Sequence, residues 1–213
     1  MPPANHGAPF VTFEGVEGSG KSTQVVHLAA HLSARGVPHV VTREPGGTPL
    51  ADEIRRLLLS PRPEAVFPET ELLLYEAARA QHVRGFISPA LEAGTAVLCD
   101  RFCDATTAYQ VHGRGLDAGI VDRLYRLAAG GLTPDLTLLF DLTPEEGLSR
   151  LARRGRAADR MEGEPPAFHR SVREGYLRLL ETGGGRLVRV DASLPEEEVR
   201  RRVLETVGTR FGW

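Results

Sequence analysis

The sequence predicts an α/β fold, a three-layer arrangement in which a five-stranded, mostly parallel sheet is covered by helices on both faces. Short apolar runs rich in β-branched residues alternate along the chain with longer segments whose apolar residues recur at helical spacing. Such alternation favours parallel strands joined by crossover helices. A glycine-rich turn also separates the first apolar run from the first helical segment. At 213 residues, the chain is long enough to bury the core of one such domain without disulfides.

The elements follow one another in a regular order. We expect the five strands at 10–13, 39–42, 95–99, 136–142 and 186–190. Helices are expected at 23–32, at 52–59, at about 69–93 and on both sides of the break at 113–115. Thr143 and Ser193 each precede a glutamate by three residues, a capping-box spacing that predicts two more helix starts. We therefore expect a flexible tail at 1–9 and a single domain at 10–213, with a mobile flap at about 150–163.

The composition gives no support to a nucleic-acid-binding or membrane protein. The formal net charge is −2, which provides no electrostatic attraction to nucleic acid or anionic lipid. No uncharged apolar run approaches the ~18 residues of a bilayer span, and residues 1–9 lack the cationic start and apolar core of a secretion signal. Cys99 and Cys103 are the only cysteines, and we interpret them as reduced thiols. We expect a cytoplasmic protein without nucleic-acid or membrane partners.

Lys21 is the only lysine in the chain, and it lies in the glycine-rich turn. The residues Gly15, Val16, Glu17, Gly18, Ser19, Gly20, Lys21 and Ser22 match the phosphate-binding pattern G-x-x-x-x-G-K-[ST], and Thr23 follows in the helix. A strand before the turn and a helix after it are the context in which backbone N–H groups surround a polyphosphate. The alternative is a chance match. We expect a P-loop NTPase-like fold that binds ATP phosphates, with the Ser22 hydroxyl on Mg²⁺.

Asp100 and Arg101 end the third predicted strand, at the sheet edge where ligands of open α/β folds bind. A carboxylate at this position can hold magnesium directly or through water. An arginine can bind a phosphate through two parallel hydrogen bonds. The alternatives are a helix N-cap for Asp100 and a surface ion pair for Arg101.

Five arginines crowd the segment that follows the fourth predicted strand. They are Arg150, Arg153, Arg154, Arg156 and Arg160, and the segment is interrupted by Gly155 and Asp159. One interpretation is a flap that closes arginines over a transferring phosphate and excludes water. The other is a solvated helix face in an arginine-rich protein.

Six separated motifs occur in a characteristic order. They are 13–23, Thr42-Arg43-Glu44-Pro45-Gly46-Gly47-Thr48, Tyr75-Glu76-Ala77-Ala78-Arg79, Asp100-Arg101-Phe102, Ala108-Tyr109-Gln110 and Pro134-Asp135-Leu136-Thr137. Together they resemble the thymidylate kinases, which transfer the γ-phosphate of ATP to dTMP and form dTDP and ADP in dTTP biosynthesis. The resemblance runs from about Phe10 to Asp191, and a P-loop glutamate without a P-loop arginine is similar to the bacterial subgroup.

The resemblance implies a role for each residue that matches a family motif. Lys21 and the loop amides would hold the ATP phosphates, while Ser22 and Asp100 would bind Mg²⁺, partly through water. A flap arginine, Arg154 or Arg160, would complete catalysis, and residues 191–193 would line the adenine pocket. The residues that would bind dTMP are Glu17 at the 3′-hydroxyl, Arg55 and Arg101 at the phosphate, Tyr75 against the base, and Arg79, Thr106 and Gln110 at its polar edge. Family members are commonly homodimers, so we expect a homodimer.

Three positions depart from the family pattern. Tyr75 stands where phenylalanine is usual, Phe102 replaces the usual tyrosine or histidine, and Ala105 replaces a common serine. None of these changes removes a charge that phosphoryl transfer needs. They affect the fine geometry of the pocket for base and sugar.

Two other functions remain open from the residues alone. One is a different nucleotide or deoxynucleoside kinase on the same scaffold. The other is a nucleotide-dependent regulatory ATPase. A GTPase switch is excluded in its usual form, because an Asn-Lys-x-Asp guanine reader needs a second lysine and the only asparagine is Asn5.

Overall fold

The sheet contains five parallel strands in the order β2-β3-β1-β4-β5. The computed structural model describes residues 7–153, 155 and 157–213. The strands are β1 (Phe10–Glu14), β2 (His39–Arg43), β3 (Ala96–Asp100), β4 (Leu136–Asp141) and β5 (Leu187–Asp191). Each boundary lies within one residue of its predicted position, so the expectation of a five-stranded parallel sheet is confirmed.

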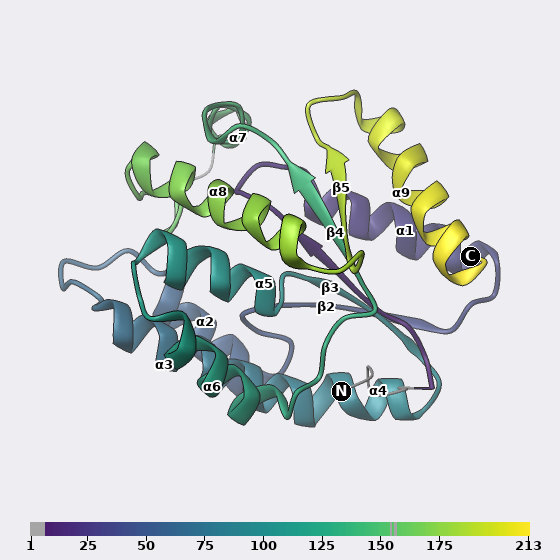
Figure 1. Cartoon of the computed structure of the whole chain (residues 1–213), viewed down its shortest axis with the longest axis horizontal. Helices are drawn as coiled ribbons and strands as arrows, with labels where there is room; N and C mark the ends of the chain where they lie inside the picture. The colour runs from purple at the N-terminus through teal and green to yellow at the C-terminus, as the bar shows by residue number, and fades with distance from the viewer. Residues whose placement is uncertain (1–6, 154, 156) are drawn as a thin grey trace.

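Helices cover both faces of this sheet (Figure 1). They are α1 (Lys21–Ala34), α2 (Pro49–Leu59), α3 (Pro68–His82), α4 (Ser88–Glu92), α5 (Cys103–Thr106), α6 (Ala118–Ala129), α7 (Pro144–Ala152), α8 (Pro166–Thr182) and α9 (Glu196–Phe211), with π-helical segments η1 (Val83–Ile87) and η2 (Thr107–Gly113). In Figure 1, α1 and α9 lie on one side of the strands, and α3, α5, α6 and α8 gather on the other. Among the described residues, no helix combines the length and apolar character needed to cross a bilayer.

The structure corrects one expectation about helix caps and adds one helix that was not predicted. Ser193 does not cap α9, because its hydroxyl and backbone N–H both donate to Asp191 Oδ1 (2.6 and 3.0 Å), and the helix begins at Glu196 after Pro195. Thr143 does cap α7 by accepting from the Glu146 N–H at 3.4 Å. Helix α8 was not predicted from the sequence, in which only the arginine-rich segment before it was assigned a role. Its buried face nevertheless recurs at helical spacing through Phe168, Val172 and Tyr176.

The core forms on both faces of the central strands. Phe13 stacks on Phe140 across β1 and β4 with ring centroids 5.9 Å apart, whereas Phe10 meets Phe102 edge-on at 5.0 Å on the opposite face. Ala8 is buried in this second cluster, and the Pro9 carbonyl accepts from the Val97 N–H at 2.9 Å. Packing thus begins earlier than the expected tail at 1–9 implies. Residues 1–6 of that tail lie outside the described residues.

The carboxyl ends of the strands meet at one edge of the sheet. Asp100 at the end of β3 lies in register with Phe13 on one side and with Arg43 on the other. Asp141 and Asp191 are paired in the same way at the ends of β4 and β5. Because all strands are parallel, the loops that follow them open toward the same side, where parallel sheets bind ligands.

Candidate active site

The glycine-rich turn between β1 and α1 can be built only with glycines at its tightest points. A Cβ on Gly15 would lie 2.4 Å from the Phe140 carbonyl oxygen, and one on Gly18 would lie 2.2 Å from the Gly147 carbonyl oxygen. The Lys21 ammonium group lies over this turn and donates to the carbonyls of Gly15 (3.0 Å) and Val16 (2.8 Å). Burial, helped by the positive charge of Arg101, lowers the pKa of Lys21 to about 8. The turn thus places one compact cation at the N-terminus of α1.

Ser22 and Asp100 lie side by side next to the turn. The Ser22 hydroxyl donates to Asp100 Oδ2 at 2.5 Å, so a residue of α1 and the last residue of β3 bring two oxygen ligands together. No group of three or more His, Cys, Asp or Glu that could hold a metal occurs within the described residues. This pair suits Mg²⁺, which usually takes one or two protein oxygens and completes its shell with phosphate and water.

Arg101 is held in a left-handed backbone conformation, with φ of 71°. Non-glycine residues adopt this conformation rarely, and where they do, the surrounding structure must hold it in place. The Arg101 guanidinium donates to Glu17 Oε1 and to the Tyr176 hydroxyl, both at 3.1 Å, and lies over the Tyr109 ring at 5.0 Å from its centroid. The next residue, Phe102, donates its N–H to the buried carboxylate of Glu14 at 2.7 Å.

Two glutamates have opposite pKa shifts: Glu14, the last residue of β1, and Glu17, in the glycine-rich turn that follows. Glu14 is fully buried and accepts from the Tyr176 hydroxyl at 2.7 Å, but desolvation dominates and raises its pKa to about 7. Burial would raise the pKa of Glu17 too, but Arg101, His169 and Lys21 outweigh it and hold that pKa well below its usual value. Glu17 is therefore a fixed anion beside the cation Arg101, three residues from a carboxyl group that resists ionisation.

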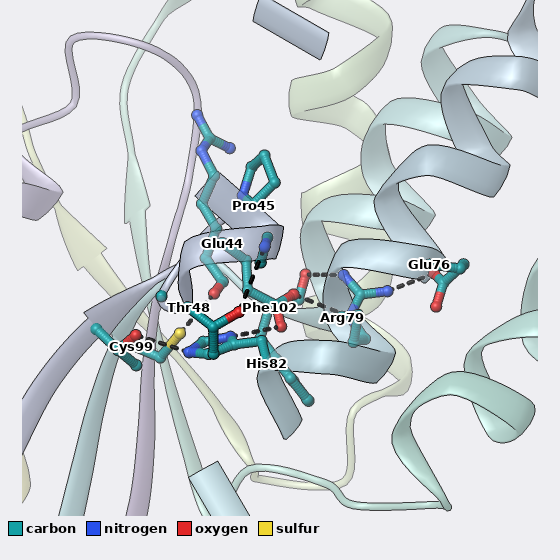
Figure 2. A network of polar contacts seen from close by, with 12 residues as sticks. Glu44, Pro45, Thr48, Glu76, Arg79, His82, Cys99 and Phe102 are labelled. Atoms are coloured by element: carbon teal, nitrogen blue, oxygen red, sulfur yellow. Dashed lines mark hydrogen bonds and ion pairs between the residues drawn. The ribbon is translucent and has the colours of Figure 1, made fainter. Parts of the chain in front are cut away.

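Arg79 lies in a buried network of charges between α3 and the loop that follows β2. Figure 2 shows its guanidinium between Glu44 and Glu76. Its Nε donates to Glu44 Oε2 at 2.9 Å, Nη1 donates to Glu76, and Nη2 donates to the Thr106 hydroxyl at 2.9 Å. On the other side of Glu44, His82 Nδ1 lies 3.1 Å from Oε1, as Figure 2 also shows. Burial disfavours the charged guanidinium, but Glu44 and Glu76 outweigh it and raise the pKa of Arg79 further.

One cavity opens at this edge of the sheet and brings the expected substrate residues together. Its lining includes Glu17, Arg55, Tyr75, Arg79, Arg101, Thr106 and Gln110, together with Lys21, Ser22 and Asp100. These residues come from the P-loop, α2, α3, β3 and the helical segments after β3. A second hollow lies on the other side of the P-loop and is lined by Gly18, Thr23, Ala192 and Ser193, among others. Asp191 is turned toward Ser193, from which its carboxylate accepts two hydrogen bonds.

The structure describes only some of the expected flap arginines. Arg154 and Arg156 lie outside the described residues. Arg160 is bound to α2 and α3, because its Nε donates to the Leu58 carbonyl at 2.6 Å and its Nη2 lies 2.7 Å from Glu71. The residues on either side of Arg160 line the cavity. Arg150 donates to the Ala192 carbonyl at 3.0 Å and borders the second hollow. Which arginine reaches a phosphate stays a prediction.

Several residues of the site were missed by the sequence analysis. Glu44 and Tyr109 stand inside the quoted motifs, so their position could have suggested a role. Tyr176 and His169 come from α8, and His169 Nδ1 lies 3.4 Å from Glu17 Oε2. Glu71 belongs to α3 and carries no motif. The one indication in the sequence is that Glu71 lies about one helical turn before Tyr75, on the helix that also carries Arg79.

Comparison with known proteins identifies similar sequences and a similar structure. The profile described as thymidylate kinase matches residues 13–203. The thymidylate kinase of Trichlorobacter lovleyi is 48% identical over 207 residues, which cover 95% of this chain and 98% of that protein. That of Desulfosudis oleivorans is 53% identical over 201 residues, with 92% and 94% covered. The crystal structure of thymidylate kinase from Ehrlichia chaffeensis has a TM-score of 0.76 and 31% identity, with 94% and 98% of the two chains covered.

Proposed function

The chain belongs to the thymidylate kinase family and phosphorylates dTMP to dTDP with ATP, and we propose how the residues around its cavity share that work. The proposal rests mainly on one observation. Seven residues expected to bind dTMP, drawn from separate segments of the chain, line the same cavity as Lys21 and Asp100. Two nucleotides can therefore meet there with their phosphates facing each other.

The donor side is built around the P-loop. Lys21 and the backbone N–H groups of residues 15–23 bind the ATP phosphates, and the hollow beside Ala192 and Ser193 takes the adenine. Ser22 and Asp100 are the residues that hold Mg²⁺. A bound ion would supply positive charge where negative charge develops on the phosphate oxygens. The Lys21 ammonium group adds to this electrostatic stabilisation.

The acceptor phosphate lies between Arg101 and Arg55. Arg55 is oriented by donating to the Pro45 carbonyl at 2.8 Å, and Arg101 by Glu17 and Tyr176. These contacts fix both guanidinium groups before dTMP arrives, which lowers the entropic cost of aligning the attacking oxygen. Glu17, kept ionised by Arg101, accepts from the deoxyribose 3′-hydroxyl.

The base lies against Tyr75, with its polar edge toward Arg79, Thr106 and Gln110. Arg79 is charged and rigidly held, so it supplies donors to the exocyclic oxygen of thymine. The flap, with Arg154 or Arg160 as the catalytic arginine, closes over the phosphates. Movement of Arg160 to that position requires release from Glu71, to which it is bound in the structure.

We also propose that the enzyme is a cytoplasmic homodimer. Large apolar side chains are exposed on three neighbouring helices: Leu50 and Leu57 on α2, Leu73 on α3, and Ile120 and Leu127 on α6. Leu127 is 74% exposed. Light scattering after size-exclusion chromatography should give the mass of two chains, and Leu127→Glu should lower it to one. A wild-type monomer contradicts this proposal.

Both cysteines are free, which fits a reducing compartment.

The substrate assignment is tested by measuring ADP release with dTMP, dUMP, dGMP, CMP and thymidine. We expect the highest kcat/KM with dTMP. A preference for thymidine or dGMP would contradict the proposed acceptor pocket. ATP hydrolysis that depends on a protein partner and transfers phosphate to no nucleotide would support a regulatory ATPase instead.

A further inference from the structure

We propose that Glu71 determines base specificity by fixing the orientation of the Gln110 side-chain amide. The proposal deepens the function above and rests on it, since it concerns the same pocket. Glu71 is a positioning residue, because it lies behind Gln110 and acts on the base only through that amide.

Glu71 is a buried carboxylate surrounded by donors. It lies on α3 with 0% of its surface exposed. Its Oε1 accepts from Gln110 Nε2 at 2.9 Å and from Arg114 Nε at 3.0 Å. Its Oε2 accepts from Arg114 Nη2 at 3.0 Å and lies 2.7 Å from Arg160 Nη2. Burial alone would raise the pKa of Glu71, but Arg114 and Arg160 outweigh it and lower that pKa below its usual value. An ionised carboxylate of this kind only accepts hydrogen bonds.

This contact decides which end of the Gln110 amide meets the ligand. A glutamine amide carries two donors on nitrogen and an acceptor on oxygen, and coordinates rarely distinguish the two ends. Here the chemistry distinguishes them, because the acceptor-only carboxylate can bond only to the NH₂ end. Gln110 is 1% exposed and lines the cavity. Within the described part of the chain, no side chain or backbone group donates to Gln110 Oε1. The cavity therefore presents a fixed acceptor at this point.

A fixed acceptor next to fixed donors selects one class of pyrimidine. Arg79 supplies donors, and its Nη2 bonds to the Thr106 hydroxyl oxygen, which leaves the Thr106 proton free to point elsewhere. Thymine offers the complementary edge, with an N3–H donor beside the O4 acceptor. A 4-amino pyrimidine reverses both groups, so its unprotonated N3 would face Gln110 Oε1 and leave two buried acceptors without a hydrogen. Glu71 thus rejects cytosine-type bases at a distance.

The same carboxylate has an alternative role that is purely structural. Through Arg114 and Arg160, Glu71 ties α3 to the segment after η2 and to the flap. Loss of these ties would lower stability or overall activity without changing the choice of base. The test must therefore measure a ratio of specificities.

The experiment compares dTMP with 5-methyl-dCMP, which differs only at the 4-position and in the N3 proton. We expect Glu71→Gln to lower the ratio of kcat/KM values, dTMP over 5-methyl-dCMP, by about tenfold or more, because an amide neighbour lets Gln110 turn over. The KM for dTMP should rise while the KM for ATP stays near the wild-type value. Arg79 and Thr106 still face the 4-position, so part of the discrimination should remain.

Glu164→Gln is the matched control. Glu164 also pairs with Arg114, at 2.6 Å, but it forms no hydrogen bond with Gln110, whose Nε2 donates to Glu71. Its substitution should leave the specificity ratio unchanged. Gln110→Leu removes the acceptor itself and should lower the ratio as much as Glu71→Gln does, which keeps the test valid if Glu71→Gln does not fold.

The outcomes separate this proposal from the proposed function. If folded Glu71→Gln or Gln110→Leu keeps the wild-type ratio, or if Glu164→Gln lowers it equally, the role of Glu71 in specificity is wrong. If the wild-type enzyme itself shows no preference for dTMP, the acceptor pocket is assigned wrongly, whatever the variants do.

Discussion

The phosphate-binding turn and the acceptor pocket face each other across one cavity, but the chain builds them in different ways. The turn consists of consecutive residues and works mainly through backbone groups, with Lys21 as its one cation. The acceptor pocket is assembled from α2, α3, β3 and the helical segments after β3, and a carboxylate holds three of its long polar side chains. Arg79 has Glu44 and Glu76, Arg101 has Glu17, and Gln110 has Glu71.

This difference indicates how each region achieves precision. The turn is held in place by close packing, since Gly15 and Gly18 lie against the Phe140 and Gly147 carbonyls, and its backbone N–H groups can bind any polyphosphate that fits. A pocket made of long side chains needs buried partners to fix them, and we propose that those partners provide selectivity for one base. Substitutions in the turn should therefore reduce turnover, whereas substitutions in the pocket should change KM and specificity.

The largest effect is expected for Lys21→Ala. Loss of the charge that stabilises the transferring phosphate should lower kcat at least ~100-fold in a coupled ADP-release assay. Arg201→Ala is the control, because this arginine pairs with Glu198 and Glu205 on the exposed face of α9 and should leave kcat unchanged. Near-normal turnover of Lys21→Ala would show that the turn does not act on the phosphate.

Arg79→Ala should separate the two regions most clearly. We expect the KM for dTMP to rise about tenfold or more with little change in the KM for ATP, because a charged hydrogen bond to the base is lost. Thermal unfolding should also show a loss of about 3 kcal/mol, because Glu44 and Glu76 remain buried without their cation.

Arg186→Ala controls for the loss of stability caused by removing an arginine. Arg186 pairs with Asp104 outside the cavity lining, so its removal should lower the melting temperature without changing the KM for dTMP. If Arg79→Ala raised the KM for ATP and left the KM for dTMP unchanged, ATP rather than dTMP would bind next to Arg79.

Tyr176→Phe should have a smaller effect, also on the acceptor side of the cavity. The hydroxyl accepts from Arg101 and donates to Glu14, so its loss releases one of the contacts that hold Arg101. We expect kcat/KM for dTMP to fall about fivefold, as the loss of one hydrogen bond would produce. Tyr125→Phe, whose hydroxyl bonds to the Leu132 carbonyl, should be close to wild type. Equal kcat/KM values for the two variants would show that the Tyr176 hydroxyl does not help to hold Arg101.

The smallest effects concern pH and stability. The pKa of Glu14 is raised to about 7 in the fold, so the stability from its protonated form is lost as pH rises from about 4.5 through 7. The pKa of Glu17 is lowered, so its stability is present above about 4.5 and lost below that pH. Denaturant unfolding across this range should show Glu14→Gln removing the decline at higher pH and Glu17→Gln weakening the decline at lower pH. The same slopes in wild type and both variants would contradict these assignments.

The turn and the sheet could be predicted from the sequence because their signals are local. A buried parallel strand is a short apolar run, and the turn needs glycine at fixed positions such as Gly15 and Gly18. Most residues that line the acceptor pocket, such as Tyr75, Arg79 and Gln110, lie inside motifs that contain the functional side chain. Arg55 and Thr106 lie outside these motifs and were assigned through the family resemblance alone. Asp100 and Arg101 could also be inferred from their place at the end of a strand.

The rest could not be predicted because it depends on contacts between distant segments. Glu71 and Gln110 are 39 residues apart, and nothing in either segment indicates that they share a hydrogen bond. Arg160 belongs to the arginine-rich segment expected to form a flap, and nothing in that segment indicates its contacts with Leu58 on α2 and Glu71 on α3. Tyr176 reaches Glu14 across 162 residues, and the helical spacing of α8 does not indicate which segment its buried face meets.

The most direct test of the account is a crystal structure with dTMP and a non-hydrolysable ATP analogue bound together. We expect the triphosphate around Lys21 and the dTMP phosphate at Arg101, with the thymine edge toward Arg79 and Gln110. A pyrimidine bound outside this cavity, or a triphosphate bound away from the glycine-rich turn, would contradict the account.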